Sequence, residues 1–99
     1  MHTYAVSVAP DCFRANHYHR KKEEWIAETS GKILLSLKWI DEDKKTEIIM
    51  DSESPECRLI HIKPGVAHKL QNISDRNSSV IVFSKTPEDK EDTIPYNIN

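Results

Sequence analysis

The stretch Asn16-His17-Tyr18-His19-Arg20-Lys21-Lys22-Glu23-Glu24 decides how this sequence is interpreted. Residues two apart on a β-strand point to the same face, so His17 and His19 would present two imidazoles side by side. Neutral imidazole is a common ligand of divalent transition metals, and Glu24 can add a carboxylate oxygen after a short connection. A distant segment must complete such a site, and His68 is the natural candidate. The pattern therefore predicts that His17, His19, Glu24 and His68 hold one divalent ion, for which Zn, Fe, Ni and Mn all stay open.

Elsewhere the apolar residues alternate with a period of two, which predicts strands rather than helices. Turn-forming clusters such as Thr29-Ser30-Gly31 and Lys63-Pro64-Gly65 separate the candidates at intervals of about 8–12 residues, as in β-sandwiches and barrels. Segment 20–26 contains good helix formers but is too short for a stable helix, so we expect a loop that runs into a strand. The candidate strands are 4–8, 33–39, 58–62, 66–73 and 80–83.

Length and composition set limits on the class of protein. The 99 residues suffice for one domain, 1–99, with a polar C-terminal tail from 87 to 99 that we expect along the surface or against a partner subunit. A net charge of -2 gives no reason to expect binding to nucleic acid or to an anionic membrane. We find no signal peptide and no apolar window of the roughly 20 residues that a membrane helix needs. Cys12 and Cys57 form no metal-spaced pair, so we expect reduced thiols in a cytoplasmic protein.

The spacing of these residues resembles the two motifs of the cupin family. The first motif has a His-x-His pair followed at fixed spacings by a glutamate and a glycine, and the second has a glycine, a histidine and an asparagine. The only two glycines of the chain, Gly31 and Gly65, fall in register with these motifs. The resemblance implies an all-β fold, a small single-domain cupin with a jelly-roll barrel. The matching residues are His17, His19, Glu24 and Gly31 for the first motif, and Gly65, His68 and Asn72 for the second.

A narrower resemblance concerns cupins that act on nucleotide-linked deoxysugars. The segment 14–18, Arg-Ala-Asn-His-Tyr, is similar to their Arg-Gly-x-His-Tyr, and 62–68 is similar to their Ile-Pro-Pro-Gly-x-x-His. These cupins are the dTDP-4-dehydrorhamnose 3,5-epimerases, the sugar-nucleotide 3,4-ketoisomerases and the cupin domain of capsular-polysaccharide enzymes. The histidine that matches His17 is the general base of the epimerases, which need no metal. His19 has a counterpart only in the other two groups, which are therefore closer to this sequence.

The resemblance leaves three functions open. The first is a metal-assisted isomerase or epimerase that acts on a keto-sugar nucleotide in cell-surface polysaccharide biosynthesis, with His17 or Glu28 moving the proton. The second is an iron-dependent dioxygenase, which the same ligands could support. The third is a non-catalytic cupin that binds a sugar or small acid and holds a structural metal. The fold hosts all three, so whether the chain is an enzyme stays open.

Other residues have both a functional and a structural interpretation. Arg14 could bind a substrate phosphate or carboxylate, or form a surface salt bridge. Glu28 lies on the strand face of Glu24 and could act as an acid or base, or be a solvated glutamate at the strand end. We expect His61 to be structural and not a ligand. We also expect a homodimer with strand 4–8 at or near its interface, because a short barrel leaves strand edges open to pairing.

Overall fold

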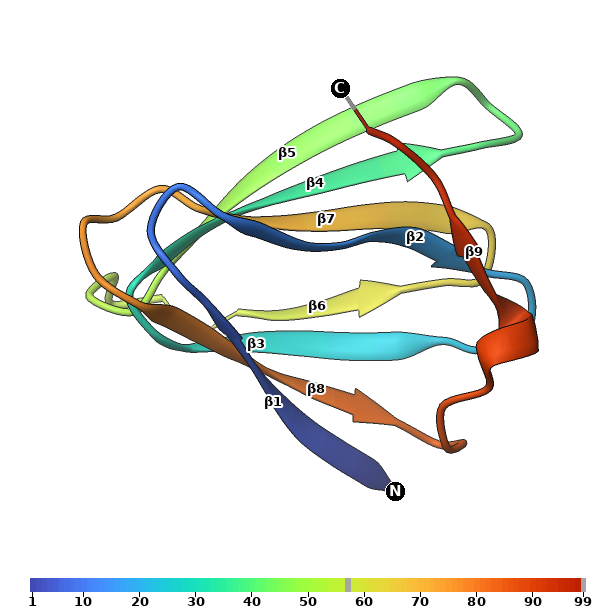
Figure 1. Ribbon diagram of the computed structural model, residues 1–99, viewed down its shortest axis with the longest axis horizontal. Coiled ribbons are helices and arrows are strands. Elements are labelled where there is room, and N and C mark those ends of the chain that lie inside the picture. The colour runs from blue at the N-terminus through green and yellow to red at the C-terminus, as the bar shows by residue number, and fades with distance from the viewer. Residues whose placement is uncertain (57, 99) are drawn as a thin grey trace.

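The computed structural model describes residues 1–56 and 58–98, which form two antiparallel sheets that face each other (Figure 1). One sheet has four strands in the order β1-β8-β3-β6, and the other has five in the order β5-β4-β7-β2-β9. The described residues form no α-helix, and none of their helices is long and apolar enough to cross a membrane. The predicted all-β fold is confirmed. Its elements are β1 (His2–Val8), β2 (Phe13–His19), β3 (Glu24–Ser30), β4 (Lys32–Trp39), β5 (Lys44–Asp51), β6 (Leu59–Ile62), β7 (Val66–Asn72), β8 (Ser78–Ser84), the 3-10 helix η1 (Lys90–Asp92) and β9 (Thr93–Pro95).

The five strands expected from apolar periodicity correspond to β1, β4, β6, β7 and β8. The segment 20–26 is a loop that enters β3 at Glu24, as expected. Strand β5 was not predicted, although it pairs with β4 along its whole length from Lys44 to Asp51. Of its eight residues only Met50 is buried, because β5 is an edge strand, so its sequence lacks a clear apolar alternation.

The core lies between the two sheets and takes one side-chain face from each. On β8, Val80 and Val82 are buried while Ile81 and Phe83 are only half-buried, as the alternation of a strand with one face inward requires. Burying each such aliphatic side chain contributes about 1.5–3 kcal/mol, so this layer drives the closure of the sheets. The buried apolar cluster consists of Val8, Ile26, Ile33, Leu35, Leu37, Met50, Ile62, Val66, Leu70, Val80 and Val82.

Buried polar side chains close one end of the barrel. The Asn72 side-chain amide donates to the carbonyls of Val8 and Arg76 at 2.8 and 2.7 Å, and its oxygen accepts from the Ser78 hydroxyl at 3.0 Å. Gly31 turns beside Ser78 with φ +78°, and a Cβ on Gly31 would lie 2.0 Å from the Ser78 Oγ. Only glycine fits this position, because both the backbone conformation and the space exclude a side chain.

The C-terminal segment crosses the other end, where η1 and β9 lie beside the β2–β3 connection (Figure 1). The buried Asp92 carboxylate accepts the backbone N–H groups of Arg20, Lys21 and Lys22 at 3.0–3.1 Å. Strand β9 then pairs with β2, so that Thr93 lies opposite His19. Within the expected polar tail, this segment therefore fixes the connection that joins the two ends of the His-x-His…Glu stretch.

Candidate metal centre

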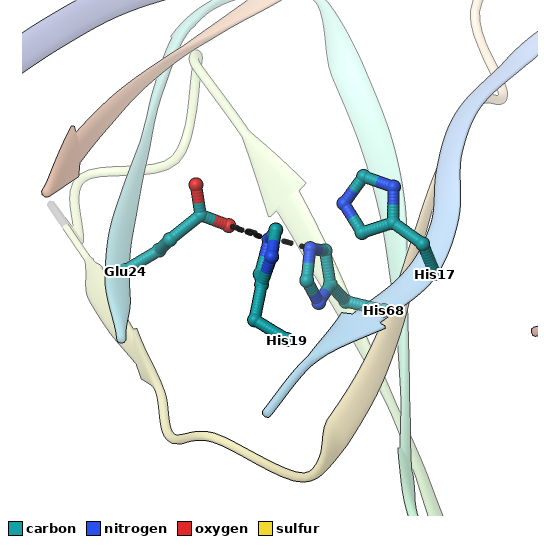
Figure 2. Close-up of side chains that lie close together, drawn as sticks. All are labelled: His17, His19, Glu24 and His68. Carbon is teal, nitrogen blue, oxygen red and sulfur yellow. Dashed lines mark ion pairs between the residues drawn. The ribbon is translucent and has the colours of Figure 1, made fainter. Parts of the chain in front are cut away.

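The four predicted ligands come together between the sheets (Figure 2). His17 and His19 lie on β2 and His68 lies on the neighbouring β7, where His17 and His68 are directly paired. Glu24 approaches from β3 in the opposite sheet. One ligating atom from each residue lies within 4.8 Å of the others, so the sheet packing assembles three imidazoles and one carboxylate around a common point.

Burial and contacts make the cluster a closed arrangement. His19, Glu24 and His68 are buried, and His17 is partly buried. The Oε1 atom of Glu24 lies 3.2 Å from Nε2 of His19 and 3.4 Å from Nε2 of His68. The ring of His17 has its centroid 4.9 Å from that of His19 and 4.7 Å from that of His68.

The outer nitrogens of two imidazoles have partners that orient the rings. Nδ1 of His68 lies 3.2 Å from the carbonyl oxygen of Val66, and Nδ1 of His19 lies 3.3 Å from the Thr93 hydroxyl. A carbonyl only accepts, so Nδ1 of His68 donates and its Nε2 keeps a free electron pair. Such outer partners fix ring orientation at metal centres.

The residues fit a divalent cation. Nε2 of His19 is buried and, although it lies near Glu24, makes no hydrogen bond of good geometry. A buried polar atom without a partner is costly, and a bound cation would satisfy it. Three imidazole nitrogens and one carboxylate oxygen suit zinc and other borderline divalent metals, and leave room for a further ligand.

The electrostatics of the cluster also suit a cation. Burial and the neighbouring His68 and His19 lower the pKa of His17 to about 4, so its imidazole is neutral near pH 7 and able to ligate. Burial alone would raise the pKa of Glu24, but the imidazoles of His19 and His68 and the Tyr4 hydroxyl outweigh it and hold that pKa well below its usual range. Glu24 is therefore ionised under all ordinary conditions.

A cavity of about 150 Å³ adjoins the cluster and is lined by Glu24, His17 and His68 together with Tyr4 and Arg14. The backbone of β2 explains how Arg14 reaches it. Ala15 and Asn16 have positive φ values of 70° and 66°, and the pairing with β7 shifts register there. This bulge brings Arg14 and His17 to the same cavity although they lie three positions apart.

The structure separates the other sequence candidates from the cluster. Glu28, the second proposed proton carrier, does not line the cavity, and its Oε2 is buried without a hydrogen-bond partner. His61 stacks on Trp25 with a centroid distance of 4.7 Å and lies 2.8 Å from Glu23, away from the ligands. Cys12 is exposed and free, and Cys57 lies outside the described residues.

Sequence reasoning missed two residues that contact Glu24. The Tyr4 hydroxyl donates to Oε2 of Glu24 at 2.8 Å, and Nζ of Lys22 lies 3.5 Å from the same oxygen. Tyr4 belongs to a different strand and Lys22 to a run of charged residues that suggests a solvated loop. No local pattern distinguishes either residue.

Two facing antiparallel sheets with three histidines and a glutamate turned inward define a cupin barrel. The model of the family described as "Polysaccharide biosynthesis C-terminal domain" matches residues 2–94, and the chain belongs to this family. No curated protein matches the chain by sequence.

Solved structures share the fold. The capsular polysaccharide assembling protein CapF from Staphylococcus aureus superposes with a TM-score of 0.88 at 20% identity, over 97% of this chain and 28% of that one. The dTDP sugar isomerase from Desulfovibrio desulfuricans G20 gives a TM-score of 0.88 at 18% identity, over 95% of this chain and 62% of that one. The sugar 3,4-ketoisomerase QdtA from Thermoanaerobacterium thermosaccharolyticum, in complex with TDP, gives 0.78 at 22% identity, over 94% and 64%. This chain thus spans less than two thirds of each.

Proposed function

We propose that this chain is a metal-binding cupin that isomerises or epimerises a keto-sugar nucleotide in cell-surface polysaccharide biosynthesis, in the cytoplasm. The observation that carries the proposal is the convergence of His17, His19, Glu24 and His68 beside a cavity inside the barrel. Membership of a polysaccharide biosynthesis family and a fold shared with sugar isomerases support the choice of substrate class.

The proposed reaction begins with removal of a proton from the carbon next to the sugar carbonyl. The electron pair of the broken C–H bond moves toward the carbonyl oxygen to form an enediolate, and return of a proton to the other face or to the neighbouring carbon gives the epimer or the isomer. A bound divalent ion would polarise that carbonyl oxygen. Neutral imidazoles and the ionised Glu24 would hold the ion.

Two groups are candidates for moving the proton, His17 and Glu28. His17 lines the cavity and is neutral near pH 7, so it is the better placed. The guanidinium of Arg14 lies at the same cavity, where it donates to the carbonyl of Ser7 at 3.2 Å, and it would bind an anionic group of the substrate.

The direct test is exchange of carbon-bound hydrogen in deuterated water. QdtA has been crystallised with TDP-4-keto-6-deoxyglucose, which makes this nucleotide sugar the first substrate to try. We expect deuterium to enter next to the carbonyl in protein loaded with Zn²⁺, Mn²⁺, Ni²⁺ or anaerobic Fe²⁺, and not after treatment with a chelator. Binding of the nucleotide sugar without exchange would overturn the enzymatic proposal in favour of the non-catalytic cupin.

We further propose that two copies of the chain associate through β1. This strand lies at the edge of its sheet, so its outer backbone groups are available to a second β1 related by a two-fold axis. Trp25 and Phe83 pair on the outer face of the same sheet, where they form an apolar hollow with Met1 and Leu59. A second copy that covers this face would add apolar burial to a small core.

A further inference from the structure

The two carboxylate oxygens of Glu24 have different neighbours. Oε1 faces the imidazoles of His19 and His68, and in Figure 2 it is the oxygen that the dashed lines reach, while the other turns away. That second oxygen, Oε2, accepts a hydrogen bond of 2.8 Å from the Tyr4 hydroxyl and lies 3.5 Å from Nζ of Lys22. The carboxylate is thus shared between the histidine cluster and a separate pair of donors.

Lys22 is an unusual partner because its side chain is only 4% exposed. Lysine is almost never fully buried unless it is paired, since removing an ammonium group from water is costly. Its compensating contacts are Glu24 and the ring of Tyr4, whose centroid lies 5.8 Å from Nζ. The buried ammonium and the tyrosine are therefore organised around one oxygen of the glutamate.

The fold fixes this arrangement from two directions. The backbone N–H of Lys22 donates to Oδ2 of Asp92 at 3.0 Å, so the C-terminal segment holds the loop from which Lys22 turns inward. Tyr4 comes from β1, which is separated from the β3 strand of Glu24 by β8. Strand pairing of β1 and β3 on either side of β8 sets the distance that the Tyr4 hydroxyl spans.

We propose that Tyr4 and Lys22 are positioning residues that engage Oε2 of Glu24 and leave Oε1 as its one oxygen available to a metal ion. This inference rests on the proposed metal centre and specifies how the carboxylate is presented there. A glutamate held in this way contributes one ligand atom rather than two. The restriction keeps a coordination position for a substrate oxygen, which an open metal site requires.

The test uses Tyr4→Phe and Lys22→Met, each with a control one element away from the carboxylate. Tyr18→Phe alters a tyrosine that packs edge-on against Tyr96, and Lys21→Met alters the exposed neighbour of Lys22. Phenylalanine and methionine keep the size of the original side chains, and circular dichroism checks that every variant folds. Affinity for Zn²⁺ is measured by competition with a chelating dye, and the neighbours of bound Co²⁺ are measured by X-ray absorption.

We expect Tyr4→Phe to weaken Zn²⁺ binding by about 10–100-fold, the usual effect of removing an outer partner, while Tyr18→Phe leaves it unchanged. In the double variant Tyr4→Phe/Lys22→Met, bound Co²⁺ should gain the second carboxylate oxygen as a neighbour, and Lys21→Met should match the unaltered chain. If the unaltered chain binds no metal, the proposed function fails and this inference fails with it. If it binds metal, but Tyr4→Phe keeps full affinity and the double variant keeps the same Co²⁺ neighbours, the inference alone is overturned.

Discussion

His19 and Glu24 face each other from opposite sheets, with Nε2 of the histidine 3.2 Å from Oε1 of the glutamate. Only the four residues 20–23 separate them in the sequence, and this connection carries the chain from one sheet to the other. The three hydrogen bonds from this connection to Asp92 hold it in place. The metal centre proposed here therefore depends on a short crossing loop as much as on its ligands.

Replacing His19 should remove one of the proposed ligands. We expect His19→Ala to lower Zn²⁺ affinity by more than the roughly 100-fold that loss of an outer partner can cost. His61→Ala is the matched control because His61 contacts Trp25 and Glu23, away from the cluster. Isothermal titration calorimetry measures both, and equal affinities for the two variants would contradict the four-ligand assignment.

Replacing His17 separates two roles proposed for the same side chain. We expect His17→Gln to weaken metal binding, because the imidazole lies with the other three groups within 4.8 Å. Bound metal is measured by elemental analysis after dialysis, alongside hydrogen exchange on the keto-sugar nucleotide. Full metal content with loss of exchange would instead identify His17 as a general base that does not ligate, as in the resemblance to the epimerases.

The two glycines should differ in their tolerance of alanine. Gly31 and Gly65 have similar positive φ values of 78° and 81°, but a Cβ on Gly31 would lie 2.0 Å from the Ser78 Oγ, and a Cβ on Gly65 would meet nothing within 4 Å. We expect Gly65→Ala to cost about 1–2 kcal/mol from backbone strain alone. Gly31→Ala should cost about 1–3 kcal/mol more from overpacking. Urea denaturation of both variants measures the difference, and equal costs would show that the contact with Ser78 is unimportant.

Asp92 should stabilise the protein in a manner that depends on pH. Burial alone would raise its pKa, but the backbone N–H groups of Lys22, Lys21 and Arg20 outweigh burial and hold that pKa below its usual range. As pH falls, the unfolded chain therefore takes up the proton first. The stabilisation is complete above about pH 4, the ordinary aspartate pKa, and is lost as pH falls through the lower folded value.

We expect Asp92→Asn to lower the free energy of unfolding by about 1–3 kcal/mol at pH 7, because the amide places a donor against backbone donors. The deficit should shrink below about pH 4. Asp75→Asn is the control, since the Asp75 side chain is 92% exposed. Denaturation at pH 7 and at pH 3 measures both variants, and a deficit for Asp92→Asn that is the same at the two pH values would contradict the role of the carboxylate.

The proposed dimer predicts an asymmetry between two edge strands. Ala5 is exposed on β1, and a two-fold axis would place two copies of it near each other, so Ala5→Glu should yield monomers by light scattering at micromolar concentration. Ile49→Glu changes a 54% exposed residue on β5, at an edge of the other sheet, and should remain dimeric. A monomeric unaltered chain, or dissociation only in the Ile49 variant, would disprove association through β1.

The sequence alone determined the features that depend on local geometry. His17 and His19 share a face because a strand has a period of two, and the alternation in β1, β4 and β8 follows from the same repeat. The resemblance of the motifs then supplied His68, which no local rule connects to the pair. Strand β5 escaped this reasoning because its place at the sheet edge leaves most of its residues exposed.

Only the tertiary structure decided which other side chains reach the ligands. Alternation placed Glu28 on the face of Glu24, yet Glu28 does not line the cavity, while the bulge at Ala15 and Asn16 brings Arg14 to it. Tyr4 and Lys22 meet Glu24 through the order of strands in a sheet and through a loop held by Asp92. These contacts depend on sheet order, register and loop closure, which arise between segments far apart in the chain and have no periodic signature within any one of them.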